Sequence, residues 1–169
     1  MNRFFTVFAG VASVAIALVL GTQIHSYAKN PNSAKISAAS TIPAYRNRPH
    51  RLAVQVDVND PAMMVLALNN VSNATQHYRE IGQNVEIEVV AFGPGLHMLR
   101  DDTSPVKERI KSMTQTMPQV TFSACGNTLD NMTKAEAKDI PLIAQARVVK
   151  AGVVRLMELQ EQGWSYLRP

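Results

Sequence analysis

Short apolar segments alternate with longer amphipathic segments from residue 52 to the C-terminus. The first apolar segment is rich in β-branched residues, and the others are likewise short and mostly apolar, which predicts strands. The predicted strands are residues 52–58, 85–92, 120–124, 146–149 and 164–167. Because these strands are separated by segments long enough for helices, the pattern predicts an α/β domain with a parallel sheet covered on both faces.

The segment after the first predicted strand has the pattern of one long helix. Apolar residues recur every three or four positions from Met64 to Ile81, which places them on one helix face. The preceding Asn59-Asp60-Pro61 supplies a capping acid and a proline at the first helical position, and Gly82 ends the helix.

Three further segments predict helices. Ser104-Pro105 begins one that Pro118 ends, and residues 152–161 form another. Thr133-Lys134-Ala135-Glu136 matches a capping box, so a short helix is expected to begin at that point. Between the second strand and these helices, Gly93-Pro94-Gly95 predicts a loop.

The N-terminus has the pattern of an export signal. Arg3 gives a short positive start, residues 4–20 form an apolar run, and Ser26-Tyr27-Ala28 offers small residues for cleavage after Ala28. The run is also long enough for an uncleaved N-terminal anchor, the only way in which we expect the membrane to be involved. Both outcomes predict a periplasmic or otherwise exported protein. Residues 29–50 are expected to be a flexible tether, and residues 51–169 one compact domain.

Charge excludes one class of partner. The chain carries a net charge of +4, and removal of residues 1–28 takes away Arg3 and no acidic residue. The basic residues gather only at residues 45–51, which we interpret as a solvated lead-in to the first strand, with an electrostatic docking patch as the alternative. We therefore expect no nucleic-acid binding. The glycines match no nucleotide-binding motif, and no His or Cys pair has metal-ligand spacing, so we expect neither a cofactor nor a metal.

Cys125 is the candidate catalytic residue. It is the only cysteine, it follows the third predicted strand, and it cannot form an intramolecular disulfide. Gly126 permits a sharp turn, while Asn127 and Thr128 offer hydrogen-bonding groups. If a helix begins at Asn127 or Thr128, its free N–H groups would lower the pKa of the thiol. The alternative is a buried cysteine that acts as a small apolar residue.

Other residues are candidates for lining the same site. Parallel strands place their carboxyl ends at one edge of the sheet, where open α/β sheets bind ligands. Gly93, Gly95 and His97 follow the second strand, and Asn59 follows the first. Helix capping explains Asn59 and Asp60 without a ligand, and a solvated loop position explains His97.

Three blocks of sequence resemble the DsrE/DsrF-like family: Gly93-Pro94-Gly95, residues 124–129 around Cys125, and residues 151–169 with their Gly-Trp-Ser-Tyr-Leu-Arg-Pro ending. The resemblance covers residues 51–169. It implies a three-layer α/β/α sandwich with a mainly parallel sheet of about five strands, and assembly into homo-oligomers, commonly trimers or hexamers. Characterised relatives are cytoplasmic sulfur-relay proteins whose cysteine after the third strand carries a persulfide, and Cys125 occupies that position. This chain differs in its export signal and in having Gly-Asn-Thr after the cysteine instead of a basic helix start.

Three functions remain open from the sequence. The resemblance favours sulfur handling, in which Cys125 accepts sulfane sulfur from a donor protein and passes it to an acceptor without a cofactor. The second is a noncatalytic exported module that binds a small ligand or supports assembly. The third is thiol redox sensing through oxidation of Cys125.

Overall fold

The computed structural model describes residues 48–169. The predicted export signal at residues 1–28 and nearly all of the tether at 29–50 lie outside the described residues. Within residues 48–169, no helix is both long and apolar enough to span a bilayer.

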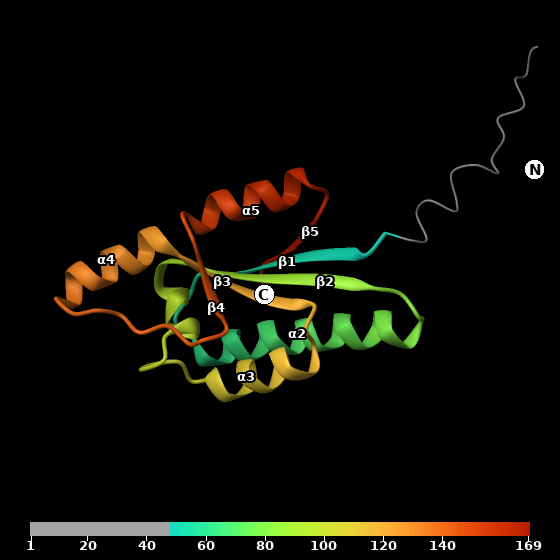
Figure 1. The fold of residues 1–169 in the computed structure, drawn as a ribbon, viewed down its shortest axis with the longest axis horizontal. Coiled ribbons are helices and arrows are strands. Elements are labelled where there is room, and N and C mark those ends of the chain that lie inside the picture. The colour runs from blue at the N-terminus through green and yellow to red at the C-terminus, as the bar shows by residue number, and fades with distance from the viewer. Residues whose placement is uncertain (1–47) are drawn as a thin grey trace, which may run out of the picture. The chain divides into compact units, whose positions relative to one another are not determined.

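Five parallel strands form one sheet in the order β4-β3-β2-β1-β5 (Figure 1). The strands are β1 (His50–Val56), β2 (Val85–Ala91), β3 (Val120–Cys125), β4 (Ala146–Val149) and β5 (Ser165–Leu167). The α-helices are α2 (Pro61–Glu80), α3 (Lys107–Thr116), α4 (Gly126–Glu136) and α5 (Gly152–Glu161), and a 3₁₀ helix, η1, spans Gly93–Leu99. Helices α2 and α3 lie on one face of the sheet and α5 on the other, which confirms the predicted α/β/α layers.

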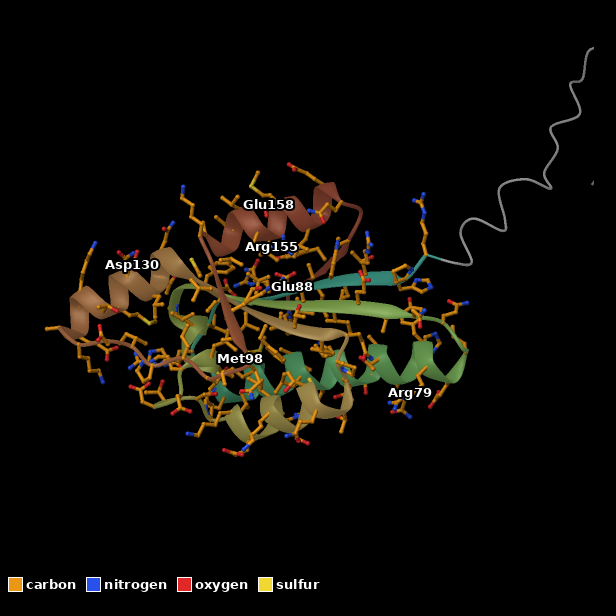
Figure 2. All side chains as sticks on the ribbon, in the orientation of Figure 1. Arg79, Glu88, Met98, Asp130, Arg155 and Glu158 are labelled. Carbon is orange, nitrogen blue, oxygen red and sulfur yellow. The ribbon has the colours of Figure 1, made fainter. Side chains whose placement is uncertain are left out.

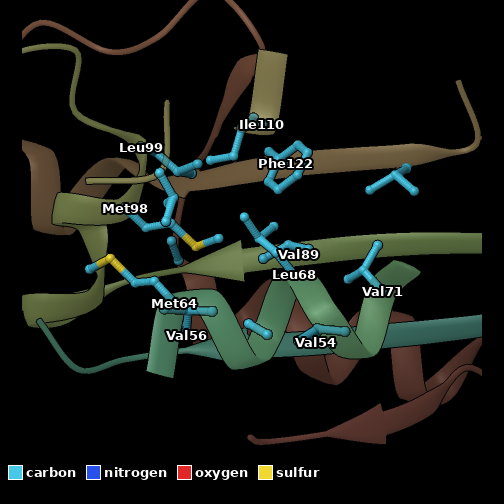
Figure 3. Close-up of a cluster of buried hydrophobic side chains, with 14 of the residues drawn as sticks. Val54, Val56, Met64, Leu68, Val71, Val89, Met98, Leu99, Ile110 and Phe122 are labelled. Atoms are coloured by element: carbon cyan, nitrogen blue, oxygen red, sulfur yellow. The ribbon is translucent and has the colours of Figure 1, made fainter. Parts of the chain in front are cut away.

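The main core lies between the sheet and the α2–α3 layer (Figure 3). Asp60 caps α2 by accepting a hydrogen bond from the N–H of Ala62 at 2.8 Å, and Pro61 occupies the first helical position, as predicted. The apolar face of α2 contributes Met64, Leu68 and Val71, which pack on alternate residues of the strands. This layer fixes the sheet and therefore the positions of the strand ends.

The opposite face of the sheet has a much smaller apolar core. Its buried members are Ala53 and Val90 of the sheet with Leu156 and Leu159 of α5. Beside this cluster the same face carries a buried carboxylate, Glu88, which is 1% exposed. Helix α5 is therefore held by few apolar contacts and by polar groups.

Two local predictions were wrong. Residues 133–136 form the last turn of α4 and not the start of a helix, because α4 begins at Gly126 and ends where Ala137 takes a left-handed conformation with φ of 49°. The segment after β2 is the 3₁₀ helix η1 and not an open loop, and its Leu96, Met98 and Leu99 are buried in the main core. The structure also begins β1 at His50, inside the predicted tether.

Candidate functional site

Cys125 lies at the carboxyl edge of the sheet, where strand β3 passes directly into helix α4. It is the last residue of β3 and the N-cap of α4, and it is paired in register with Val149 of β4. The residue is 5% exposed. The condition set for a lowered thiol pKa, a helix beginning beside Cys125, is therefore met, and the helix begins at Gly126.

Backbone N–H groups at the N-termini of two helices lower the pKa of the Cys125 thiol. Asn127 and Thr128 contribute from the first turn of α4, and Gly152 contributes from the start of α5. Burial raises the pKa of the Cys125 thiol, but the hydrogen bonds from the Thr128 side chain and from these three backbone groups outweigh it, so the pKa is lowered overall. Hydrogen-bond donors at a helix N-terminus favour the thiolate, which is the nucleophilic form of cysteine.

The Thr128 hydroxyl links the thiol to the loop after β2. Its Oγ1 accepts a hydrogen bond from the N–H of Gly93 at 2.9 Å, and the side chain hydrogen-bonds Cys125. Because Oγ1 accepts from Gly93, the hydroxyl proton remains available to the sulfur. The structure thus places Thr128 beside the thiol and bonds Gly93 to Thr128; both were proposed from the sequence as site lining.

Small residues allow the two helix ends to approach each other. A methyl group on Gly126 would lie 3.1 Å from the carbonyl oxygen of Val149, and one on Gly152 would lie 2.9 Å from Cβ of Phe92. The N–H of Asn127 donates to the carbonyl oxygen of Lys150 at 3.2 Å, which ties α4 to the segment that leads into α5. Both helix N-termini are therefore held close to one strand end.

The remaining predicted lining residues have other roles. Gly95 packs against the end of β1, where a Cβ would meet the Val56 carbonyl oxygen at 2.3 Å. The Nδ1 of His97 is hydrogen-bonded to Thr103 Oγ1 at 2.9 Å. Asn59 is exposed beside the Asp60 cap of α2. None of these three residues contributes a hydrogen bond to Cys125.

Comparison with known proteins identifies the family. The model of the DsrE/DsrF-like family matches residues 59–169. The chain belongs to the DsrE/DsrF-like family. A solved structure of the same fold is MTH1491 from Methanobacterium thermoautotrophicum, described as a protein of unknown function, with a TM-score of 0.61 and 32% sequence identity over 71% of this chain and 99% of that one. A search of curated proteins finds no match.

This DsrE/DsrF-like protein also has a buried arginine that the sequence analysis missed. Arg100, at the end of η1, is 1% exposed. Its guanidinium donates to both carboxylate oxygens of Asp102, at 2.9 and 2.8 Å, and to both of Glu136, the last residue of α4. The network fixes the end of α4 opposite Cys125. The loop predicted from Gly93-Pro94-Gly95 gave no sign of it, although an arginine directly after the buried pair Met98-Leu99 is a usable signal.

A second missed network surrounds Glu88 on the α5 face. The carboxylate accepts two hydrogen bonds from Arg155 and one from Ser123, and it also pairs with Arg147 of β4. Burial raises the pKa of Glu88, but the hydrogen bonds from Arg155, Ser123 and Arg147 lower it to about 2. The carboxylate is therefore ionised at neutral pH and compensated by two arginines.

Among residues 48–169, no group of three or more His, Cys, Asp or Glu side chains is arranged to hold a metal ion. The site around Cys125 consists of a thiol, one hydroxyl and backbone N–H groups. Such an arrangement stabilises negative charge on sulfur, and it suits nucleophilic attack by a thiolate.

Removal of the Thr128 hydroxyl is expected to slow the reactions of the thiol. In Thr128→Val, the sulfur loses one donor, so the pKa of Cys125 rises and alkylation by iodoacetamide at pH 7 slows about tenfold, the usual scale for one charge-assisted hydrogen bond. The measurement is the alkylation rate as a function of pH. Thr128→Ser keeps the hydroxyl and should react like the wild type, whereas equal rates for the Val and Ser variants would contradict the assigned hydrogen bond.

Proposed function

We propose that this protein is an exported sulfur-handling member of its family, in which Cys125 carries sulfane sulfur as a persulfide. The observation behind the proposal is the position of Cys125 at the N-terminus of α4 and beside the start of α5, where N–H groups of both helices and the Thr128 hydroxyl lower the pKa of its thiol. Membership of the DsrE/DsrF-like family supports a sulfur-relay-related role. We propose a periplasmic location on the basis of residues 1–28.

The proposed transfer is a thiolate exchange without net oxidation. The Cys125 thiolate attacks the terminal sulfur of a donor persulfide, R–S–SH, so that a new S–S bond forms to Cys125 and the donor S–S bond breaks. The donor leaves as R–S⁻, and the proton stays on the transferred sulfur until the persulfide ionises. Attack by an acceptor thiolate on that sulfur reverses the exchange and regenerates Cys125. The donors that hold the Cys125 thiolate also suit the anionic persulfide.

Loading with sulfur tests this function directly. Purified protein is treated with a small persulfide donor, freed of excess donor and weighed by mass spectrometry. We expect a gain of one sulfur atom that is absent in Cys125→Ser and is lost on addition of a thiol acceptor. A wild-type protein that gains no sulfur while Cys125 remains alkylatable would rule out the persulfide carrier.

The burial of Cys125 favours a second candidate. With 5% exposure, the thiol offers little surface to a donor protein, which fits a noncatalytic binding or assembly module. In that case, the folded protein gains no sulfur, and Cys125 reacts only after denaturation. The same alkylation and loading experiments therefore separate the two candidates.

We also propose that the domain works as a homo-oligomer, a trimer or hexamer, that meets its sulfur donor and acceptor in the exported compartment. The measurement is light scattering of the mature protein after gel filtration. Its intact mass reports whether cleavage follows Ala28 or the N-terminal segment remains as a membrane anchor.

A further inference from the structure

Glu88 is a carboxylate buried at the centre of the sheet. It lies on β2 with Ala53 of β1 and Thr121 of β3 as its register partners, and it points towards α5 (Figure 2). Its neighbours on the same face of β2 are Glu86, which is partly exposed, and Val90, which belongs to the small apolar core under α5. A charge in this position is stable only if it is paired and hydrogen-bonded.

Arg155 supplies the pairing from helix α5. Its Nε donates to Glu88 Oε1 and its Nη2 to Oε2, both at 2.8 Å, which is a bidentate contact with parallel hydrogen bonds. Figure 2 shows Arg155 on the sheet side of α5, above Glu88. A bidentate pair fixes both the rotation of α5 about its axis and its distance from the sheet at this point, whereas a single apolar contact does not.

The contact lies one turn from the end of α5 that touches the thiol. Arg155 is three residues after Gly152, and its own N–H donates to the carbonyl oxygen of Ala151, the N-cap, at 3.0 Å. The start of α5 lies beside Cys125, since Cys125 pairs in register with Val149 and the Asn127 N–H donates to Lys150 O. The Gly152 N–H is among the groups that lower the pKa of the thiol. Arg155 is the first side chain of α5 that bonds to the sheet, and the buried apolar anchors Leu156 and Leu159 follow it along the helix.

The other side of Glu88 connects to β3. Ser123 Oγ donates to Glu88 Oε1 at 2.7 Å and accepts from Arg147 Nε at 3.0 Å. Ser123 precedes Cys125 by two residues, so both side chains lie on the α5 face of β3. The carboxylate is therefore bonded both to the strand that carries the thiol and to the helix that donates to it.

From these contacts, we propose that Glu88 and Arg155 are positioning residues that lock the N-terminus of α5 onto β3, so that the Gly152 N–H reaches the Cys125 sulfur. The proposal rests on the thiolate chemistry proposed above, but it concerns the alignment of a donor and not the transfer of sulfur. Loss of either partner releases the first turn of α5 and removes that donor from the sulfur.

The test is the pH dependence of Cys125 alkylation in Glu88→Gln, Arg155→Met and the double variant. Positioning predicts that both single variants shift the reactivity profile upward by about one pH unit, equal to about tenfold slower alkylation at pH 7, as for loss of one donor to a thiolate. The double variant should match the singles, because all three break the same link. Arg155→Lys keeps the charge without the bidentate geometry and should fall between wild type and Arg155→Met.

A purely electrostatic influence gives a different result. Removal of the negative Glu88 would then shift the profile down, and removal of the positive Arg155 would shift it up. Other charged or titratable side chains also lie on α4, α5, β4 and η1 and on the segment before α5, and they are unchanged in these variants. They are Asp130, Lys134, Glu136, Glu158, Glu161, Arg147, His97 and Lys150. Opposite shifts for the two single variants would therefore overturn the proposal.

Glu86→Gln is the matched control. Glu86 lies on the same strand and face and also pairs with an arginine, Arg51, but that pair is exposed and does not involve α5. We expect its alkylation profile to equal that of the wild type. Thermal unfolding identifies the pH range in which each variant is folded. If folded Arg155→Met and Arg155→Lys keep the wild-type profile, the pair has only a structural role and the proposal fails, whatever the outcome of sulfur loading.

Discussion

Gly95→Ala is expected to destabilise the domain more than any other single methyl group added to a glycine of residues 48–169. The new Cβ would lie 2.3 Å from the carbonyl oxygen of Val56 and 2.7 Å from the backbone nitrogen of Asp57. Both are backbone atoms at the end of β1, so no side-chain rotation relieves the clash. Since overpacking of a rigid site costs typically 1–3 kcal/mol and occasionally more, we expect a loss of about 3 kcal/mol or more in the free energy of unfolding.

Urea unfolding followed by circular dichroism measures this loss, and Gly82→Ala is the control. Gly82 has a φ of +66°, but a Cβ there meets nothing within 4 Å, so its replacement costs only backbone strain of about 1 kcal/mol. A similar loss in both variants would mean that β1 and η1 separate easily, contrary to the close contact described above.

Arg100→Met has the second largest expected effect. The substitution keeps an unbranched side chain but removes a buried guanidinium that donates four hydrogen bonds to Asp102 and Glu136. Breaking a buried ion pair typically costs 3–5 kcal/mol, and because both carboxylates remain partly exposed to water, we expect about 2–3 kcal/mol here. Amide hydrogen exchange should also become faster in the last turn of α4.

A control variant and the pH dependence of stability test whether the effect of Arg100→Met comes from its ion pairs with Asp102 and Glu136. Lys138 pairs with the same two carboxylates but is exposed, so Lys138→Met should cost at most about 0.5 kcal/mol. The hydrogen bond from Arg100 lowers the pKa of Glu136 to about 2. A carboxyl group whose pKa is lowered by folding stabilises the folded state at pH values above its unfolded-state pKa. This stabilisation is lost as the pH falls through its folded-state pKa. The difference between wild type and Arg100→Met should therefore shrink between pH 4.5 and pH 2, the two pKa values of Glu136, and a constant difference would contradict the ion pair.

The sequence was sufficient for the sheet and for the place of Cys125. Strong local signals mark these elements: the Asp60-Pro61 cap, the helix end at Gly82, and apolar strands such as residues 85–91. The residues around the thiol were also found, since the chain places Gly126, Asn127 and Thr128 directly after a strand. The hydrogen bond between Thr128 and Gly93 was not, because it joins residues 35 positions apart. Nor was the approach of α5 to Cys125, since it depends on the tertiary fold.

The local sequence pattern gave wrong predictions at positions whose structure depends on tertiary contacts. Helix α4 begins with Gly126, a poor helix former, and buries none of its residues, so its start gave no apolar periodicity. Glu88 follows the alternation of residues 85–88 and resembles a solvent-facing position. The apolar residues 89–92 that follow it indicate a strand buried on both faces, which is the signal that a paired, buried carboxylate was to be expected.

The thin apolar layer beneath α5 has a consequence for access to the thiol. Two buried apolar side chains of α5, Leu156 and Leu159, hold this helix to the sheet together with the Arg155–Glu88 pair, so we expect α5 to open locally at a lower free energy than the rest of the domain. Such an opening uncovers the sulfur of Cys125, but it also withdraws the Gly152 N–H. The opening of α5 would thus admit a large reactant but would make the thiol less nucleophilic. Small reactants that reach Cys125 while α5 is closed are therefore expected to react fastest.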